Sequence, residues 1–390
     1  MEQFALESGP FAEDPYPIFE RLRREAPVFW HEGLQAYIVT RYADCRRIAE
    51  DAVNFYNSPD GNPPIPYVMQ LAGANHARLR KLINPAFSPR GLANAVEPAL
   101  VGIADEMIDR FIDRGRAELV DELAEPMATR VISLLLNVDR SREKWMVKTA
   151  DEMLEAEANP ANAELQKDYP EKLAALRAMF AARLAEERRS PSGNLITELV
   201  QAEQDGGKLS AEELLANTMI LVVAGVETTK RLVSSLIYLL LSHPDQLRQV
   251  REDRALLKPA IEETLRLHSP NQPIMRFAQN EVEVGGLTMQ PGTRLYGMRG
   301  AANRDPEVWP DPDRFDIHRF TAKGLPPHLS FGWGPHMCVG AYLSRRETTV
   351  AMDRLLDRTR DLRLDPDHEV RYIGFRNRGP KALHVLFERA

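Results

Sequence analysis

The residue with the most distinctive surroundings is Cys338. It lies in the run FGWGPHMCVG, residues 331–340, and a helical pattern follows from Ala341 to Leu356. The N-terminal end of a helix has unpaired backbone N–H groups, which donate hydrogen bonds to a thiolate and lower its pKa. Glycine allows the close backbone approach that this requires. The run therefore predicts a thiolate at Cys338, whereas a lone cysteine is ordinarily a small buried residue, and that interpretation is kept for Cys45.

A second candidate lies in the middle of a helix predicted from Ser210 to about Leu241, where residues 224–229 read AGVETT. Glycine and a pair of threonines are poor choices for a helix interior. They are tolerated where a ligand crowds the helix, and a threonine hydroxyl can replace part of the backbone hydrogen bonding and widen a local groove. Glu227 and Thr228 are therefore candidates for chemistry, the alternative being a polar stripe on a half-exposed helix.

Charged residues also recur at helical spacing in two other segments. Glu263 and Arg266 are three positions apart, and His76 and Arg80 are four apart, so each pair lies on one helical face. Taken singly, such residues are most often solvated surface groups of little energetic value.

Taken together, these motifs resemble those of the cytochromes P-450. Residues 331–340 match the family's haem-binding pattern Phe-x-x-Gly-x-His-x-Cys-x-Gly at every defining position. Glu263 and Arg266 match its Glu-x-x-Arg pair, and residues 224–229 match its oxygen-activation motif. The resemblance covers the chain from about Asp14 to its end. One departure is Glu227, because aspartate is commoner there in bacterial members.

The resemblance implies a site for haem b (iron protoporphyrin IX). Cys338 is the implied axial ligand of the iron, and Phe331 and Gly340 belong to the same haem-binding loop. Haem propionates are negatively charged and must be paired if they are buried. The family's propionate donors correspond to His76, Arg80, Arg276 and His336. Arg319 corresponds to the arginine that joins Glu263 and Arg266 in a structural triad, which pins the irregular segment 305–327 beneath the haem.

The implied activity is that of a haem-thiolate monooxygenase, in which thiolate donation to iron favours O–O cleavage. One oxygen atom from O2 would enter a small, largely apolar organic substrate by hydroxylation, epoxidation or O-dealkylation. Thr228 is expected to hold water and oxygen by hydrogen bonds, and Glu227 to relay protons from solvent. The alternatives are a peroxide-driven haem-thiolate enzyme, a non-catalytic haem sensor, and a helical scaffold without haem. The Glu227–Thr228 pair argues against the first two.

The expected electron donor is a separate protein, because the sequence contains no GxGxxG dinucleotide motif. A ferredoxin, with a 2Fe-2S cluster as the expected type, would be served by an NAD(P)H ferredoxin reductase. Weak, salt-sensitive docking is expected on a basic surface near Cys338. Its expected residues are Arg78, Lys81, Arg345 and Arg346.

Family position also implies residues that face the substrate: Tyr67, Ile220, Val223, Ala224, Gln272, Pro273 and Ile274. They suggest a compact apolar ligand with one polar anchor. The substrate itself is not specified by these residues.

The elements that must position these residues are mainly helical. Apolar residues recur at three- and four-residue spacing from Gly91 to about Leu241, with a break expected over Asn159–Tyr169. Alternating runs predict smaller β-rich parts at about 27–41, 270–300 and 370–388. The Pro-rich stretch 54–72 and the segment 305–327 are expected to be irregular loops. The fold class is therefore mainly α with a small β-rich region, with the haem between the long central helix and the Cys338 loop with its following helix.

Composition excludes several other classes of protein. The chain of 390 residues is 44% hydrophobic and 27% charged, and its net charge of -7 is spread along the sequence, so neither disorder nor nucleic-acid binding is indicated. Two cysteines are too few for a disulfide framework and suggest a reducing cytoplasm. The longest apolar stretches are too short to cross a bilayer, and no signal peptide is recognised. We expect one domain spanning residues 1–390.

Overall fold

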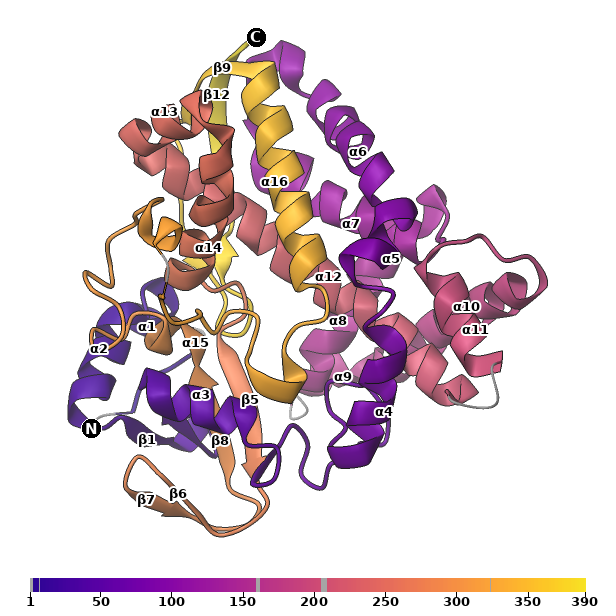
Figure 1. Ribbon diagram of the computed structural model, residues 1–390, viewed down its shortest axis with the longest axis vertical. Coiled ribbons are helices and arrows are strands. Elements are labelled where there is room, and N and C mark those ends of the chain that lie inside the picture. Colours follow the sequence, from indigo (N-terminus) through magenta and orange to yellow (C-terminus); the bar gives the residue numbers. More distant parts are fainter. Residues whose placement is uncertain (1–2, 7, 159–161, 205–208, 323) are drawn as a thin grey trace.

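The structure is a computed structural model that describes residues 3–6, 8–158, 162–204, 209–322 and 324–390. Figure 1 shows a large helical part beside a smaller part that contains the main sheet. The α-helices are α1 (Gly9–Glu13), α2 (Tyr16–Glu25), α3 (Tyr42–Glu50), α4 (Gly73–Ile83), α5 (Pro89–Ala95), α6 (Glu97–Asp109), α7 (Glu125–Leu135), α8 (Glu143–Ala158), α9 (Ala163–Lys167), α10 (Tyr169–Arg189), α11 (Leu195–Gln204), α12 (Ala211–Ser242), α13 (Pro244–Glu252), α14 (Leu257–Leu267), α15 (Arg299–Ala302) and α16 (Ala341–Arg358).

The strands are β1 (Val28–His31), β2 (Ala36–Val39), β3 (Phe55–Tyr56), β4 (Arg116–Glu118), β5 (Pro273–Ala278), β6 (Val282–Val284), β7 (Leu287–Met289), β8 (Arg294–Met298), β9 (Thr359–Leu364), β10 (Tyr372–Ile373), β11 (Gly379–Pro380) and β12 (His384–Arg389). The main sheet has the order β1-β2-β8-β5-β3, and a second sheet has the order β4-β12-β9. The fold class is therefore mainly α with a small β-rich region, as the sequence predicts.

Two local expectations were wrong. The expected break between residues 159 and 169 contains the short helix α9, which begins where the Asn162 side chain accepts hydrogen bonds from the backbone N–H groups of Glu164 and Leu165; residues 159–161 lie outside the described residues. The segment from Gly91 to Leu241 also contains strand β4, which pairs with β12 near the C-terminus. Such long-range pairing leaves no periodic signal in a three-residue strand.

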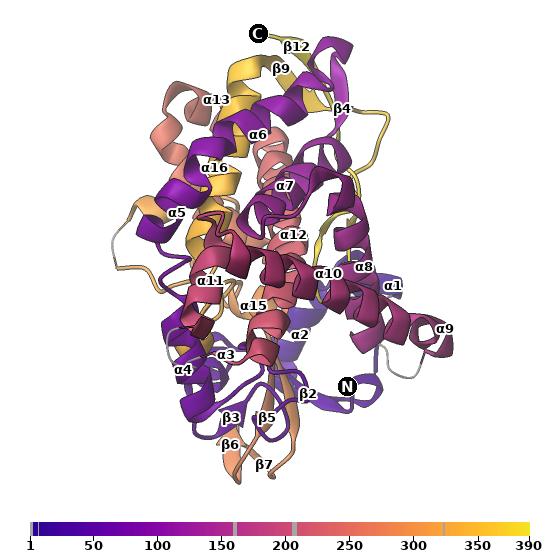
Figure 2. The same cartoon turned by 90° about the vertical axis from the view of Figure 1, so that its right-hand side faces the viewer.

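The central helix α12 is specified at its N-terminus by a capping box. The Ser210 hydroxyl accepts the backbone N–H of Glu213, and the Glu213 carboxylate accepts that of Ser210. The helix packs against α7, α8, α10, α14 and α16. Figure 2 shows it running between α7 and α10 through the interior of the helical part. Because α12 is surrounded, its residues can contact several elements that are distant in sequence.

The Cys338 loop leads directly into α16, which packs along α12. Thr229 on α12 donates to Ser344 on α16 across 3.5 Å, which fixes the separation of the two helices one turn beyond the loop. The loop approaches α3 at its other end, where an added Cβ on Gly334 would lie 2.7 Å from Glu50 Cα. Gly334 has φ +72, so glycine is needed there both for conformation and for space.

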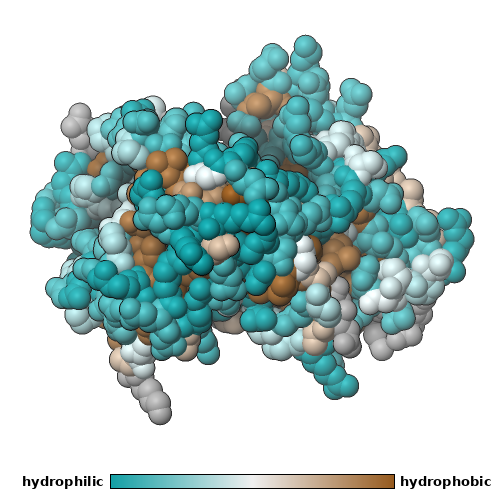
Figure 3. Space-filling model, turned by 90° about the horizontal axis from the view of Figure 1, so that it is seen from above, coloured by the Kyte–Doolittle hydropathy of each residue, from teal (hydrophilic) through white to brown (hydrophobic). Residues whose placement is uncertain are grey.

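The face of the molecule shown in Figure 3 is mainly hydrophilic, with small and separate hydrophobic patches. Within the described ranges, we find no helix with both the length and the apolar composition needed to cross a bilayer.

Candidate functional site

Cys338 occupies the end of a tight loop whose backbone is internally bonded. Its N–H donates to the Phe331 carbonyl at 2.7 Å, which closes the loop, and the Arg345 guanidinium lies over the Phe331 ring at 4.4 Å. The thiol is solvent-accessible, yet many protein atoms surround it, and burial raises the pKa of Cys338. A hydrogen bond from the Gly340 backbone and the charges of Arg80 and Arg299 oppose that rise in pKa.

The sequence-based expectation of a lowered pKa at Cys338 was therefore wrong for the protein by itself. The helix-terminal donor is present, but its effect on the pKa is smaller than that of desolvation. A bound metal ion changes this balance because a coordinating thiol is deprotonated outright. The loop thus provides a ligand whose anionic form depends on the cation that it binds.

Two histidines expected to bind propionate are stacked on one another. The rings of His76, from α4, and His336, from the Cys338 loop, have centroids 3.8 Å apart. The buried atoms His76 Nε2 and His336 Nδ1 have no hydrogen-bond partner in the structure. Burial, and next the neighbouring positive charge of Arg80, lowers the pKa of His76 to about 4. Burial and the adjacent His76 lower the pKa of His336 to about 2.

The two arginines expected beside them are also buried or half-buried. Arg276 donates to the carbonyls of Ile48, Ala49 and Met275, and no acid is bonded to it in the part of the chain that the structure describes. Burial, with the repulsion of Arg299, lowers the pKa of Arg276 to about 9. Burial also lowers the pKa of Arg80. A group of cations and unpaired donors without acids fits a ligand that carries buried carboxylates.

Arg299 belongs to the same region and was missed by the sequence analysis. Arg299 is half-buried, and desolvation of its guanidinium lowers its pKa to about 10, while Cys338 and Cys45 oppose that shift. Its guanidinium donates to Asn271 and to the Pro273 carbonyl at 2.6 Å, while its Nε has no partner. The signal that could have found it is an arginine in an otherwise apolar stretch, residues 295–302.

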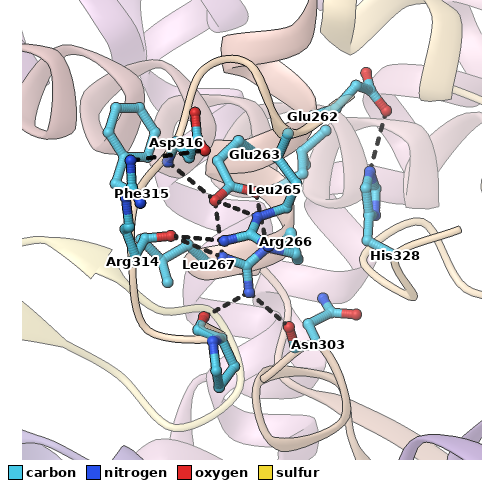
Figure 4. Close-up of polar contacts among 12 residues, drawn as sticks. Glu262, Glu263, Leu265, Arg266, Leu267, Asn303, Arg314, Phe315, Asp316 and His328 are labelled. Atoms are coloured by element: carbon cyan, nitrogen blue, oxygen red, sulfur yellow. Dashed lines mark hydrogen bonds and ion pairs between the residues drawn. The ribbon is translucent and has the colours of Figure 1, made fainter. Parts of the chain in front are cut away.

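The Glu-Arg-Arg triad is assembled as the spacing and resemblance predict. Arg266 contacts Glu263 through two hydrogen bonds of 2.7 and 2.8 Å, and both side chains are fully buried. Arg319 Nε donates to Glu263 at 3.0 Å. Figure 4 shows how Arg266 also reaches the backbone of the irregular segment, through the carbonyls of Asn303, Pro312 and Arg314. These bonds satisfy the buried charges and hold residues 303–319 against α14.

A second ion cluster, not expected from the sequence, lies beside the triad. Glu262 accepts hydrogen bonds from Arg345 and interacts with His328 at 3.1 Å. Burial alone would raise the pKa of Glu262, but the hydrogen bonds from Arg345 and His328 lower it to about 2. Glu262 therefore joins α14 to α16 just beyond the Cys338 loop.

On α12, the structure gives Gly225 and Thr228 clear but different roles. An added Cβ on Gly225 would lie 2.4 Å from Ile132 Cδ1 of α7, so crowding by α7 by itself requires a glycine here, and crowding by a ligand stays a prediction. Thr228 donates to the Ala224 carbonyl at 2.8 Å, the expected side-chain replacement of helix bonding. Ala224 is exposed despite its position in the central helix. Ala224 and Thr228 therefore present one accessible face of α12.

Glu227 is not a free carboxylate. It pairs with Lys230 and, at 3.4 Å, with Arg231, and only 14% of its side chain is exposed. The sequence-based prediction of a direct relay from solvent did not include these cations. Lys230 and Arg231 lie three and four residues after Glu227 on the same helix, and this spacing could have predicted both pairs.

Three of the expected substrate-facing residues come together. Tyr67, Ile220 and Val223 line one small cavity of about 20 Å³, with Met219. Its other walls come from α8 (Ala150 and Met153) and α10 (Leu176), which sequence reasoning missed because any apolar helix residue is equally consistent with the core. The lining is apolar apart from the Tyr67 hydroxyl.

The expected residues on β5 do not all face this space. Ile274 is buried toward α3, beside Gly297 and near Cys45, whereas Met275 and Phe277 line a separate hollow of about 460 Å³ with the loop 57–64. Successive side chains in a strand face opposite sides, and pairing with β8 fixes which side each takes. The assignment of Ile274 to the pocket is therefore wrong, and Pro273 is on the Met275 side. Gln272 is buried, with its Nε2 bonded to the Ser269 carbonyl.

Asn217 was also missed, although it joins the Pro-rich loop to α12. Its Oδ1 accepts the Val68 N–H at 2.8 Å, and its Nδ2 donates to the Pro66 carbonyl at 3.1 Å. These bonds hold Tyr67 over Ile220 and Val223. An asparagine among the apolar residues of this helix is the feature of the sequence that could have indicated such a contact.

The expected basic docking surface is partly neutralised. Arg78 pairs with Glu213 at the start of α12, Arg345 pairs with Glu262, and Arg346 pairs with Glu97. Lys81 is exposed. The charge of Arg78 is compensated at the start of α12, and its place on a docking surface stays a prediction.

Comparison with known proteins agrees with this geometry. The family model described as "Cytochrome P450" matches residues 54–371. Cytochrome P450 107B1 of Saccharopolyspora erythraea is 36% identical, covering 91% of this chain and 90% of that protein. Cytochrome P450 monooxygenase PikC of Streptomyces venezuelae is 36% identical, covering 97% and 92% respectively. The structure of the myxobacterial cytochrome P450 CYP267B1 with myristic acid has a TM-score of 0.89 and 31% identity, and the match covers 99% of both chains.

The fold and the site thus define a haem-thiolate oxygenase. The chain belongs to the cytochrome P450 family. It is a P450 monooxygenase, and its cofactor is haem b, bound in this family through a cysteine thiolate.

Proposed function

We propose that this enzyme inserts one oxygen atom from O2 into a small, largely apolar organic substrate, with Cys338 as the iron ligand. The observation that carries the proposal is that Cys338 lies among the cations Arg80 and Arg299, beside the stacked rings of His76 and His336, whose buried nitrogens have no partner among the described residues. When bound, haem b supplies oxygen activation, which its thiolate ligand promotes.

The chain's own residues would hold and surround this group. His76, His336, Arg80 and Arg276 pair with its carboxylates, and Arg299 adds a further buried positive charge beside them. The triad of Glu263, Arg266 and Arg319 holds the irregular segment 303–319 in place below the haem. Pairing with the carboxylates of the haem requires donors that lack acid partners in the protein, and within the described residues the donors of Arg276 and Arg299 meet only carbonyl and amide oxygens.

Thr228 and Glu227 would serve proton delivery. The Thr228 hydroxyl donates to Ala224, which leaves its oxygen able to accept a hydrogen bond from water or from a protonated group on the accessible face. Glu227 is next in sequence and carries the carboxylate from which a proton could reach that hydroxyl. Glu227 also pairs with Lys230 and Arg231, which join it to the charged residues on the same helix.

The cavity of about 20 Å³ holds no more than a water molecule, so it is the residues lining it that support an apolar substrate with one polar contact. Its lining is apolar except for Tyr67, and loop 57–72 is tied to α12 above it. Because CYP267B1 was solved with myristic acid, fatty acids are one class to test, beside aromatic acids, terpenoids and macrolides. The assay is the low-spin to high-spin Soret shift of the haem-loaded protein across such a panel.

We further propose that electrons come from a separate ferredoxin, with NAD(P)H ferredoxin reductase as its source, and that the enzyme acts in the cytoplasm. Exposed Lys81 and half-exposed Arg345 and Arg346 support a docking surface, and both cysteines are free thiols. Product formed with ferredoxin, reductase, NAD(P)H and O2 is the expected result. Product formed only with hydrogen peroxide would instead establish a peroxide-driven enzyme, and haem without any turnover would favour a sensor.

A further inference from the structure

The loop at residues 57–72, which precedes α4, forms part of the walls of two separate spaces (Figure 1). On one side, Tyr67 lines the apolar cavity with Ile220 and Val223 of α12. On the other side, the loop lines the hollow of about 460 Å³ together with β5. Movement of this one loop would therefore change both spaces.

The cavity lined by Tyr67 is too small for an organic molecule. Its volume of about 20 Å³ holds one water molecule, whereas pockets for small organic ligands measure roughly 300–1,000 Å³. Tyr67 is 6% exposed, so it closes this space. The other walls belong to α8, α10 and α12, which pack against one another. Irregular loops open at a lower free-energy cost than packed helices, so a substrate gains room by lifting the loop.

The two arms of the loop are bonded to each other, so the loop moves as one unit. The Ser58 hydroxyl donates to the Gln70 carbonyl at 2.7 Å, and the Ala72 N–H donates to the Gly61 carbonyl at 3.3 Å. Closer to the tip, the Gln70 N–H donates to the Tyr67 carbonyl at 2.9 Å. Because these bonds preserve the shape of the loop, a tie between its tip and α12 controls the position of the whole loop.

Asn217 of α12 supplies such a tie on both sides of Tyr67. Its Oδ1 accepts the Val68 N–H at 2.8 Å, and its Nδ2 donates to the Pro66 carbonyl at 3.1 Å. Nδ2 also donates to the Glu213 carbonyl, one turn earlier on α12, at 2.7 Å, which fixes the direction of the amide. Asn217 is only 3% exposed, so water replaces its bonds to the loop only after the loop has lifted, and breaking them costs free energy.

We propose that Asn217 is a positioning residue that latches the loop at 57–72 over the cavity and so selects substrates by size. The inference rests on the proposed function, since it names a residue that decides which molecules this enzyme admits. A molecule that displaces Tyr67 must break the bonds of Asn217 to Pro66 and Val68. A molecule that fits without lifting the loop leaves both bonds intact. The latch therefore opposes bulky molecules far more than small ones.

Asn217→Ser removes the latch and keeps a bond within α12. A serine hydroxyl is too short to reach the loop, but it can donate to the Glu213 carbonyl, as the Thr218 hydroxyl donates to the Leu214 carbonyl at 2.8 Å. Thr218→Val is the matched control, because it removes a buried hydrogen bond that lies within α12. Asn217→Asp is a milder variant, which keeps an acceptor for the loop and loses the donor.

Amide hydrogen exchange measures release of the loop without turnover. In the haem-loaded protein, exchange over residues 65–71 should be at least about tenfold faster in Asn217→Ser than in the wild type, because the loop opens more often. Asn217→Asp should lie between them, and Thr218→Val should match the wild type. Wild-type exchange in Asn217→Ser, or in Asn217→Asp if the serine variant does not fold, contradicts the latch.

Two imidazoles test selection by size. Imidazole and 1-tritylimidazole both bind haem iron through a ring nitrogen and differ in bulk, and stopped-flow spectroscopy of the Soret band gives their association rates. Asn217→Ser should accelerate association of 1-tritylimidazole at least about tenfold and of imidazole less than about twofold, with no change in Thr218→Val. Acceleration of both to the same extent, or of neither, contradicts selection by size. A wild type that forms no product contradicts the proposed function alone, because neither measurement depends on turnover.

Discussion

At the scale of single residues, the site is defined by groups that the protein leaves incomplete. Cys338 is an accessible thiol whose pKa burial raises, and His76 and His336 have buried nitrogens without partners. Each unpaired histidine nitrogen costs free energy in the protein alone, because a buried polar atom without a hydrogen bond is destabilising by about 1–3 kcal/mol. On the proposed function, haem binding would satisfy these histidine nitrogens and the Cys338 thiol together, which would explain why sequence motifs so far apart are needed at one place.

Cys338→Ser tests the iron ligand. The variant should fold, because serine is close in size to cysteine and the Cys338 N–H bond to Phe331 is made by the backbone. Thiolate ligation should be lost, since a hydroxyl is a far weaker donor to iron. The measurement is the Soret band of the reduced, CO-bound protein. A variant that keeps the wild-type thiolate spectrum would show that Cys338 is not the ligand.

Thr228→Ala tests proton delivery at the accessible face of α12. Haem binding and reduction should be unchanged, because the substitution alters neither Cys338 nor the residues proposed to donate hydrogen bonds to the haem carboxylates. Product per NAD(P)H should fall and hydrogen peroxide should rise, since reduced oxygen that is not correctly protonated is lost. Thr228→Ser, which keeps the hydroxyl, should remain coupled. If Thr228→Ala is as well coupled as the wild type, Thr229 or water held by Glu227 must take this role.

At the scale of elements, α14, α16 and the irregular segment 303–319 are joined by buried ions rather than by regular structure. Arg266 and Arg319 together donate to the carbonyls of Asn303, Pro310, Pro312 and Arg314, with Glu263 as their common anion. A long loop can be rigid when side chains replace the backbone bonds that a helix or sheet would supply.

Arg319→Ala tests whether this connection supports haem binding. The change leaves Glu263 with a single cation and frees the carbonyls that Arg319 binds, at a cost of roughly 3–5 kcal/mol for a broken buried pair. Haem content and melting temperature should both fall. Arg314→Ala is the control, because the triad uses only the Arg314 carbonyl. Unchanged haem content and melting temperature in Arg319→Ala would contradict the supporting role of the triad.

At the scale of the whole molecule, charges on the α4 and α16 side would govern electron supply. Arg345 and Arg346 are already paired with Glu262 and Glu97, so exposed Lys81 is the least compensated of the expected basic residues. A charged residue at the solvent-exposed edge of an interface mainly changes the rate of association and the dependence of that rate on salt.

Lys81→Ala should therefore slow reduction by ferredoxin several-fold at low salt and by less at high salt, where screening weakens the attraction. Arg78→Ala is the matched control from the same helix. Arg78 pairs with Glu213 in the first turn of α12, so its charge is already compensated. Stopped-flow reduction at two ionic strengths measures both. Equal rates for Lys81→Ala and the wild type would place the docking surface elsewhere.

The sequence by itself determined the family, the residues proposed to carry the chemistry and most of the elements that bear them. Short-range patterns suffice for this purpose: a cysteine before a helix, Glu263 and Arg266 on one helical turn, and the apolar periodicity of α12. The tertiary structure decided what surrounds them. It showed that Ile132 crowds Gly225 and that strand register turns Ile274 away from the pocket. The pKa of a group and the direction of a side chain depend on neighbours distant in sequence, and those neighbours are specified only when the helices and strands pack.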